Sequence, residues 1–293
     1  MCRLYGFISN ELTKVECSLV HAQNALMHQS RSDLRGIDHP DGWGIVRYAE
    51  GMPLAERRAT AAHEDIWFSV TAERTYAHVV VAHIRKATVG QPRLENTHPF
   101  CHGCWTLAHN GTVAGFDHLQ SELERETDPE LLVYRKGETD SELVFYWLLT
   151  RLKRAGIEVD RPQDDMSLLV DIVGRAVADI DQRSRQAAPG VISKLNLLLT
   201  NGRLLLAACW NHTLYFVERR GIHDCEICGI PHVHHQRGTP YRALVVASEP
   251  ISPEAWQEIP NHSIVITNQA ADLRTYPVPR RDSASACREA RSS

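Results

Sequence analysis

The sequence lacks the long hydrophobic run that a membrane-spanning helix requires. Its apolar stretches are short and interrupted, whereas a spanning helix needs about 20 consecutive apolar residues. The N-terminus also lacks a basic segment followed by a hydrophobic run, which is the pattern of a secretory signal peptide. These absences predict a cytoplasmic protein with no membrane partner.

A concentration of positive charge is absent as well. The formal net charge is −4 at pH 7, and Lys and Arg are scattered along the chain instead of forming a stripe interleaved with aromatics. Proteins that bind nucleic acid use such basic surfaces, so we expect no nucleic-acid partner. No internal repeat is visible, and 43% hydrophobic content over 293 residues is enough for one large core.

The chain does contain eight cysteines, which in the cytoplasm are reduced thiols available for catalysis or metal binding. Cys2 is the most informative, because removal of Met1 would leave a thiol and a free α-amine on one residue. An α-amine titrates at roughly 7.7 to 8.0, so near neutral pH part of it can accept the proton of a thiol whose ordinary pKa is ~8.5. By itself, a cysteine at position 2 is most often a coincidence.

Apolar runs and turn residues predict a mixed α and β protein. Asn201 and Gly202 indicate a hairpin, and helical periodicity covers 141–155 and 166–180. Thr139 or Asp140 is suited to cap the first helix. Strands are expected at 79–82, 105–108, 195–199, 204–208, 214–217, 244–247 and 264–267.

Strand-rich blocks on either side of two long helices predict an α+β layered sandwich with one core. We expect one domain over 1–278. The segment 279–293 is rich in Arg and Ser and predicts a disordered tail.

Short polar motifs follow several apolar runs, where side chains can converge over a rigid sheet. Arg85 ends a strand, with Thr88 close behind, and its guanidinium can bind a carboxylate through two parallel hydrogen bonds. The alternative is an ordinary surface arginine. His98 precedes Pro99 in a rigid segment, and a structural histidine is the commoner explanation there.

Two further motifs combine small or acidic residues with strand and helix ends. In the pair Asn110 and Gly111, an amide side chain and a backbone N–H can point at one developing negative charge, although a hairpin turn explains the pair equally well. Asp140 can hold a substrate ammonium or cap a helix. Trp43, in a loop with Gly42 and Gly44, either covers a pocket or turns a corner.

Taken together, the order and spacing of Cys2, Trp43, Arg85, Asn110 and Asp140 resemble the class II glutamine amidotransferase domain of the N-terminal-nucleophile hydrolases. The resemblance runs over nearly the whole chain. It is closest to the stand-alone YafJ-like branch, which includes γ-glutamyl hydrolases of ergothioneine and glutathione metabolism. The family fold is a four-layer αββα sandwich, in agreement with the α+β pattern above.

The resemblance implies a role for each matching position. Cys2 is the expected nucleophile, and Asn110 with the Gly111 N–H is the expected oxyanion hole. The substrate-binding residues it implies are Arg85 and Thr88 for the α-carboxylate, Asp140 for the α-ammonium, and His98 for shaping and polarising the pocket. One departure is Lys86, where synthase-linked relatives often carry tryptophan, which leaves Trp43 as a substitute lid.

Two oppositely charged anchors suit the amino-acid head of a glutamine or γ-glutamyl small molecule, with a thiolate in reach of its γ-carbonyl. The expected reaction is hydrolysis through a thioester that releases glutamate and ammonia or an amine, with no cofactor required. The 293 residues leave no room for an attached synthase. The alternatives are a glutaminase that supplies ammonia to a separate synthase subunit, and a catalytically silent binding scaffold.

A second candidate site lies at Cys225 and Cys228, which are followed by His232, His234 and His235. These residue types and this spacing suit a structural zinc ion held by Cys225, Cys228, His232 and His234. The alternative is a polar loop with reduced thiols, because the histidines follow within a few residues. A pair at Cys101 and Cys104 is a weaker candidate of the same kind.

Overall fold

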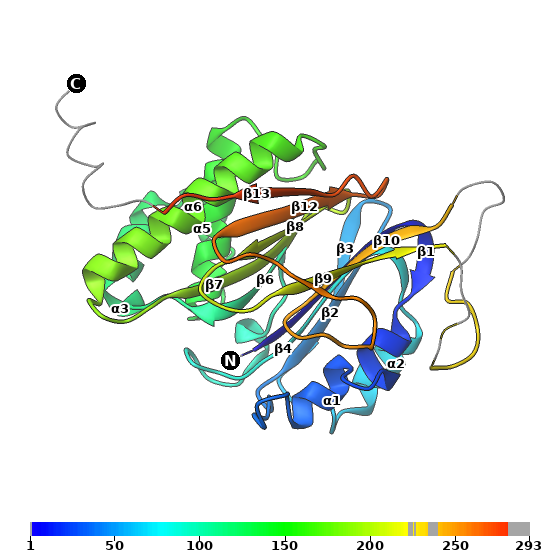
Figure 1. Cartoon of the computed structure of the whole chain (residues 1–293). Helices are drawn as coiled ribbons and strands as arrows, with labels where there is room; N and C mark the ends of the chain where they lie inside the picture. Colours follow the sequence, from blue (N-terminus) through cyan, green and yellow to red (C-terminus); the bar gives the residue numbers. More distant parts are fainter. Residues whose placement is uncertain (1, 222–224, 226, 234–239, 281–293) are drawn as a thin grey trace.

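A computed structural model of the chain describes residues 2–221, 225, 227–233 and 240–280. Two antiparallel sheets lie face to face, and each is covered on its outer side by helices (Figure 1). The predicted αββα sandwich is therefore confirmed. Of the predicted tail, residues 281–293 lie outside the described residues, as does His234 of the predicted zinc ligands.

The larger sheet has seven strands in the order β11-β9-β10-β1-β4-β2-β3. Their bounds are β1 Arg3–Lys14, β2 Trp43–Ala49, β3 Met52–Arg58, β4 Tyr76–Ile84, β9 Tyr215–Arg220, β10 Arg242–Ala247 and β11 Gln257–Glu258. The smaller sheet has six strands in the order β13-β12-β8-β7-β6-β5. Their bounds are β5 Phe100–His102, β6 Trp105–Thr112, β7 Lys194–Thr200, β8 Leu204–Cys209, β12 Ser263–Asn268 and β13 Arg274–Pro277.

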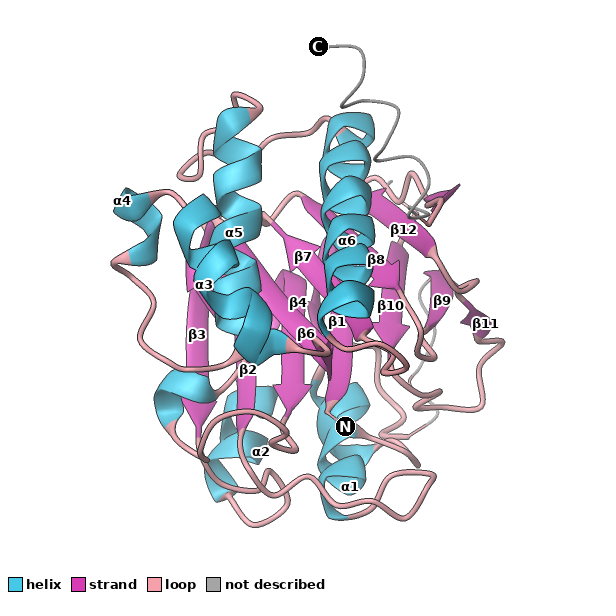
Figure 2. Ribbon diagram, turned by 90° about the vertical axis from the view of Figure 1, so that its left-hand side faces the viewer, coloured by secondary structure: helices cyan, strands magenta, loops and turns pink. Residues whose placement is uncertain are grey.

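The helices form two separate outer layers. Over the six-stranded sheet lie α3 Phe116–Glu126, α5 Asp140–Arg154 and α6 Met166–Ala187, with the short α4 Pro129–Leu132 beside α5 (Figure 2). Over the seven-stranded sheet lie α1 Leu26–Arg31, α2 Ile66–Glu73 and the single turn η1 Cys17–His21. A second short turn, η2 Leu94–Asn96, precedes β5. No helix in the described ranges has both the length and the apolar character needed to cross a membrane.

Burial on both faces explains why the central strands are continuous apolar runs. In β4, Val79 and Val81 point into the core between the two sheets, whereas Val80, Ala82 and Ile84 face the helices α1 and α2. A strand covered on both sides loses the alternation of apolar and polar residues that marks a half-exposed strand. The same packing makes the apolar run at 79–82 recognisable in the sequence.

The predicted elements are present, most of them with small shifts at their ends, whereas α6 continues to Ala187, seven residues beyond the predicted end. The strands expected in β4, β6, β7, β8, β9, β10 and β12 and the two long helices α5 and α6 are confirmed. β7 and β8 form the hairpin expected at Asn201 and Gly202. Thr139 is the N-cap of α5, where its side chain accepts a hydrogen bond from the Glu142 N–H.

Trp43 does not lie where its expected role as a lid requires. It is the first residue of β2 and is completely buried. Its ring packs edge-on against Phe68 of α2 at 5.3 Å, and its Nε1–H donates to the Asp65 carboxylate at 2.9 Å. The lid interpretation is wrong, because this side chain fills the core between the seven-stranded sheet and α2.

Truncating this tryptophan is expected to reduce stability strongly. Trp43→Ala should lower the free energy of unfolding by about 3 to 5 kcal/mol, the usual cost of removing a large buried aromatic. Trp67→Ala is the matched control, because Trp67 is 44% exposed and its contact with Arg58 is worth only about 0.5 to 1 kcal/mol. Urea unfolding of both variants is the measurement. Equal losses would show that Trp43 is not a core residue.

Candidate active site

The antiparallel pairing of β1 with β4 and β10 brings three segments together at one end of the larger sheet. Arg3 pairs with Ile84 of β4, and Tyr5 pairs with Ala247 of β10. Cys2, Arg85 and Ser248 are therefore the next residues outward on three neighbouring strands. Residues far apart in sequence meet here because strand register fixes their positions.

The Cys2 thiol lies against the backbone of Lys86. Its sulfur accepts the Lys86 N–H and donates to the Lys86 carbonyl, both at 3.4 Å, and the residue is 8% exposed. Burial raises the pKa of the Cys2 thiol, while the Lys86 N–H and the Arg85 guanidinium oppose this shift without cancelling it. The thiol is thus protonated at neutral pH and needs a local base to react as a thiolate.

Lys86 contributes its backbone and not its side chain. Its ammonium points away from the Cys2 thiol and pairs with Asp38 at 2.6 Å.

The segment that contains Arg85 and Lys86 is held from the other side by Asp41, whose carboxylate accepts the Ala87 N–H at 2.7 Å. The Gly42 carbonyl accepts the Arg85 N–H at 2.7 Å. The loop before Trp43 therefore positions the strand end that carries Arg85.

The Arg85 guanidinium is buried under the loop 89–91. Three of its N–H groups donate to the carbonyls of Val89, Gly90 and Gln91 at 2.9 to 3.0 Å. A guanidinium has five donors, so two remain for a carboxylate. Arg85 thus holds the loop 89–91 in place, in addition to being a candidate for binding the substrate carboxylate. Thr88, directly before this loop, is exposed, and its hydroxyl lies 2.9 Å from the Thr112 hydroxyl.

Asn110, in β6 of the smaller sheet, faces the end of the larger sheet. Its Nδ2 donates to the Ser248 hydroxyl at 3.1 Å, and the same hydroxyl accepts the Leu4 N–H at 2.9 Å. Ser248 thereby ties the Asn110 amide to the strand that begins next to Cys2. Ser248 was not singled out in the sequence, because its role depends on the pairing of β10 with β1.

Gly111 is required by the approach of β7. A Cβ at this position would lie 1.7 Å from the Lys194 carbonyl oxygen, which is far inside the contact distance of any two atoms. Glycine therefore lets β6 and β7 pair closely beside Asn110. The hairpin turn considered from the sequence is absent here, because both residues lie within β6.

Asp140 is the first residue of α5 and is buried. One carboxylate oxygen accepts the Val113 N–H at 2.8 Å, and the other accepts the Ser141 N–H at 2.7 Å and the Ser141 hydroxyl at 3.0 Å. The cap of the helix is Thr139, so capping does not account for Asp140. Its two oxygens offer about four acceptor positions, which leaves capacity for an ammonium group.

His98 lies in the interior behind the site. Its ring stacks on the His83 ring, with 4.3 Å between the ring centroids, and contacts the Phe100 ring, with 4.5 Å between the centroids. Both ring nitrogens lack hydrogen-bond partners among the described residues. Burial holds the pKa of His98 well below its ordinary value, so the ring is neutral. Burial likewise lowers the pKa of His83 to about 3. Neutral stacked rings fill space here.

Arg3 anchors the start of the chain and was not singled out in the sequence. Its guanidinium donates to the Cys2 carbonyl at 3.0 Å and pairs with Glu249 at 2.7 Å and with Asp33. All three charged side chains are buried. Buried charges that are paired in this way resist displacement, because losing one partner leaves an uncompensated charge.

The predicted zinc ligands lie at the opposite end of β1. Cys225, Cys228 and His232 meet there, and the fourth nearby group is Cys17. The pair Cys101 and Cys104 does not form a similar site, since their sulfurs contact Thr106 and the Val159 carbonyl, respectively.

Comparison with known proteins gives consistent matches over most of the chain. The family model for class-II glutamine amidotransferases matches residues 1–291. YafJ of Escherichia coli is 30% identical over 231 residues, which are 75% of this chain and 82% of YafJ. The γ-glutamyl-hercynylcysteine sulfoxide hydrolase of Mycobacterium tuberculosis is 25% identical over 282 residues, which are 93% of this chain and 96% of the hydrolase.

A solved structure supports the fold. The glutamine aminotransferase class-II domain protein of Silicibacter pomeroyi matches with a TM-score of 0.64 at 18% identity. The match covers 96% of this chain and 100% of that chain. Similarity at this level of identity establishes the fold alone.

Removing the Ser248 hydroxyl is expected to cost stability. Ser248→Ala leaves the buried Leu4 N–H and the Asn110 amide without their acceptor, at about 1 to 3 kcal/mol in the free energy of unfolding. Ser184→Ala is the control, because Ser184 is fully buried and its hydroxyl has no partner among the described residues. Chemical denaturation compares the two. If the loss of stability is no larger than that of the control, Ser248 does not support Asn110.

Proposed function

Because the chain belongs to the class II glutamine amidotransferase family, we propose that this enzyme hydrolyses the γ-amide of a γ-glutamyl small molecule with Cys2 as nucleophile. The observation that carries the proposal is the position of the Cys2 thiol. It lies opposite Arg85 at the end of two paired strands and within electrostatic reach of Asp140.

The base in this proposal is the α-amine of Cys2, exposed when Met1 is removed. The raised pKa of the thiol makes such a base necessary at neutral pH, and an α-amine with a pKa of roughly 7.7 to 8.0 is suited to the task. The amine takes the thiol proton, and the thiolate attacks the γ-carbonyl carbon. The Arg3 hydrogen bond to the Cys2 carbonyl holds this terminus in place.

Attack converts the carbonyl oxygen into an oxyanion. We assign its stabilisation to the Asn110 amide and the Gly111 N–H, where one such donor is worth roughly 3 to 4 kcal/mol of transition-state energy. Ser248 orients the Asn110 side chain. The C–N bond then breaks, the leaving amine receives the proton from the α-ammonium, and a γ-glutamyl thioester remains on Cys2. Water, deprotonated by the same α-amine, hydrolyses the thioester to glutamate.

The two charged side chains select the amino-acid head of the substrate. The remaining donors of Arg85 suit its α-carboxylate, and the Asp140 carboxylate suits its α-ammonium. The donors and the base are all supplied by the protein, so we propose that hydrolysis requires no cofactor.

The similarity to the M. tuberculosis hydrolase extends over 93% of this chain. It favours a γ-glutamyl small molecule as the substrate over glutamine that supplies ammonia to a synthase partner.

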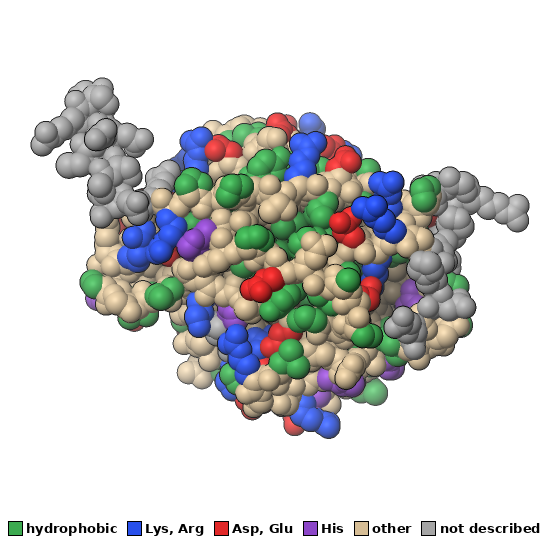
Figure 3. Space-filling model, viewed as in Figure 1, with side chains coloured by type: hydrophobic (Ala, Val, Ile, Leu, Met, Phe, Trp, Pro, Cys, Tyr) green, Lys and Arg blue, Asp and Glu red, His purple; other side chains and the backbone are tan. Residues whose placement is uncertain are grey.

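We further propose a cytoplasmic location, in keeping with free thiols at the described cysteines. Acidic and basic side chains are interspersed on the face in Figure 3, and we propose no nucleic-acid partner.

Blocking the α-amine is expected to abolish activity. A chain that carries a short extension before Cys2 has a peptide amide in place of the base, whereas the processed chain should show kcat/KM rising with pH as the amine loses its proton near pH 8. Intact mass defines each preparation, and glutamate release from glutamine, glutathione and other γ-glutamyl amides is the readout. Equal activity of the extended chain would eliminate the mechanism. No glutamate from any substrate would favour a silent scaffold.

Substituting either anchor is expected to raise KM. Arg85→Lys and Asp140→Asn each remove a charge-assisted hydrogen bond worth about 1.5 to 3 kcal/mol, which corresponds to roughly a 10- to 150-fold loss in kcat/KM. Arg175→Lys and Asp171→Asn, an exposed pair on α6, are the matched controls.

Steady-state glutamate release over a range of substrate concentrations separates KM from kcat, and thermal melting checks that each variant is folded. Arg85→Lys also weakens the hold on loop 89–91, so a modest loss of stability is expected for it and not for Asp140→Asn. Wild-type KM in both anchor variants would exclude these residues from substrate binding.

A further inference from the structure

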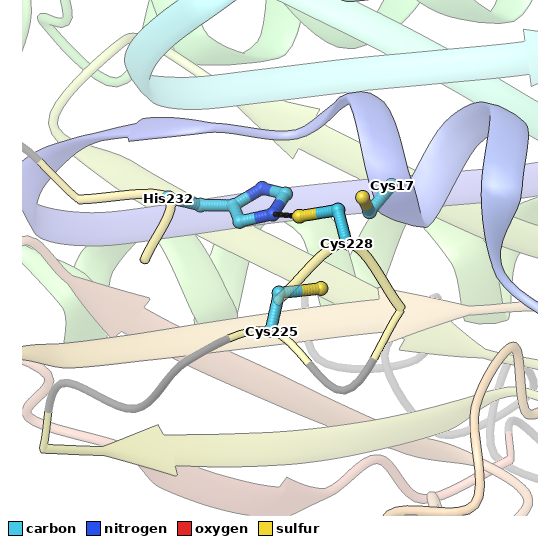
Figure 4. Close-up of side chains that lie close together, drawn as sticks. All are labelled: Cys17, Cys225, Cys228 and His232. Atoms are coloured by element: carbon cyan, nitrogen blue, oxygen red, sulfur yellow. Dashed lines mark hydrogen bonds between the residues drawn. The ribbon is translucent and has the colours of Figure 1, made fainter. Parts of the chain in front are cut away.

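Four metal-ligating side chains from two distant parts of the chain meet at the far end of β1. Cys17 belongs to η1, which is separated from β1 by two residues, and Cys225, Cys228 and His232 belong to the connection between β9 and β10 (Figure 4). One ligand atom from each lies within 4.8 Å of all the others. We propose that these four residues bind a structural zinc ion.

The ligand set matches the chemistry of zinc. Three thiolates and one imidazole are a common structural zinc set, and soft sulfur ligands exclude magnesium and calcium. Tetrahedral zinc with Zn–S bonds of about 2.3 Å places its sulfurs about 3.8 Å apart. Atoms already within 4.8 Å of one another reach this geometry through shifts of about 1 Å or less. With all four positions filled by protein, no open position is left for water.

The histidine is already oriented as a zinc ligand. His232 Nδ1 lies 3.1 Å from the Lys14 carbonyl, which can only accept, so Nδ1 carries the proton. Nε2 therefore presents its lone pair, and it faces the Cys228 sulfur at 2.9 Å. Metal-bound histidines usually donate their other ring N–H to a carbonyl or carboxylate in this way.

The backbone around Cys225 and Cys228 also holds these residues near His232. The Ile227 N–H points at the Cys225 sulfur at 3.4 Å. Gly229, directly after Cys228, has φ +71°, and its N–H donates to the Cys225 carbonyl at 2.7 Å. This tight turn returns the chain to His232, whose carbonyl accepts the Lys14 N–H at 2.7 Å.

A zinc ion can reach these ligands from solvent, and its binding releases their protons. Cys228 is exposed, and the described residues leave a cleft of about 550 Å³ lined in part by Cys17, Cys225 and His232. Binding replaces the three thiol protons with one Zn²⁺, and three protons pass to solvent.

The site is independent of the reaction at Cys2. The two ends of β1 pair with Ile84 and Tyr76 of β4, eight residue steps apart, which at about 3.3 Å per residue separates them by roughly 26 Å. Zinc removal should therefore alter stability and leave glutamate release within about twofold of its starting value when assayed below the melting temperature.

The test uses the full-length protein purified without chelator. Elemental analysis should give about one zinc per chain. Cys228→Ser removes a ligand at an exposed position. After gel filtration with a mild chelator, this variant should retain at most about one tenth of the zinc that the wild type retains. Cys101→Ser is the matched control, from the other pair of cysteines with two intervening residues, and should retain the full amount.

Two further measurements do not depend on activity. Replacement of zinc by Co²⁺ should give the visible absorption and thiolate charge-transfer bands of a tetrahedral sulfur-ligated centre in the wild type and in Cys101→Ser only. Chelation should lower the Tm of these two proteins and leave that of Cys228→Ser unchanged. Equal zinc in all three proteins would overturn the proposal. Protein that is purified without chelator, contains no zinc and carries a disulfide among Cys17, Cys225 and Cys228 would overturn it as well.

Discussion

The antiparallel pairing of β1 between β4 and β10 is the constraint on which the rest of the site depends. Its register sets Cys2 opposite the start of the segment that carries Arg85, and it sets Ser248 beside Leu4. A shift of one residue would turn Leu4 and Ile8 out of the core between the sheets. The hydrophobic core thus fixes the position of the Cys2 thiol.

Buried polar contacts convert this backbone position into an ordered site. Asn110 is held by Ser248, Asp140 by the Val113 N–H, and Arg85 by the carbonyls of loop 89–91. Desolvation makes such groups costly unless their hydrogen bonds are formed. Each contact links a different element to the strand ends, so the site is preorganised by parts of both sheets and by α5.

The sequence predicted the parts of the fold in which local pattern and burial agree. The strand at 79–82 and the helix at 141–155 are strongly apolar in the period of their structure, and both are present in β4 and α5. β1 was not recognised, because it includes the buried polar residues Arg3, Ser9 and Glu11. β3 was missed for the opposite reason, since it is an edge strand with mostly exposed residues.

For the candidate site, the sequence identified residues whose chemistry is visible in short motifs and missed those that act through distant pairing. Ser248 and Cys17 become interpretable only when β1 brings them to Asn110 and Cys228, respectively. Trp43 was misplaced because glycines on both sides suggested a loop. Gly44 is instead a strand residue, where a Cβ would lie 2.1 Å from the His98 carbonyl oxygen.

The two ends of β1 also differ in how they are supported. Near Cys2 the ladder to β4 is regular, but it is interrupted between Ile8 and Thr13. The polar side chains of Ser9 and Thr13 there bond to the Glu11 carbonyl instead of packing in a core. A zinc ion joining Cys17 to the connection between β9 and β10 would fix this less regular end, because it closes a long loop of chain that is open in the unfolded state. Strand pairing positions the end of β1 next to Cys2, and a metal cross-link would hold the other.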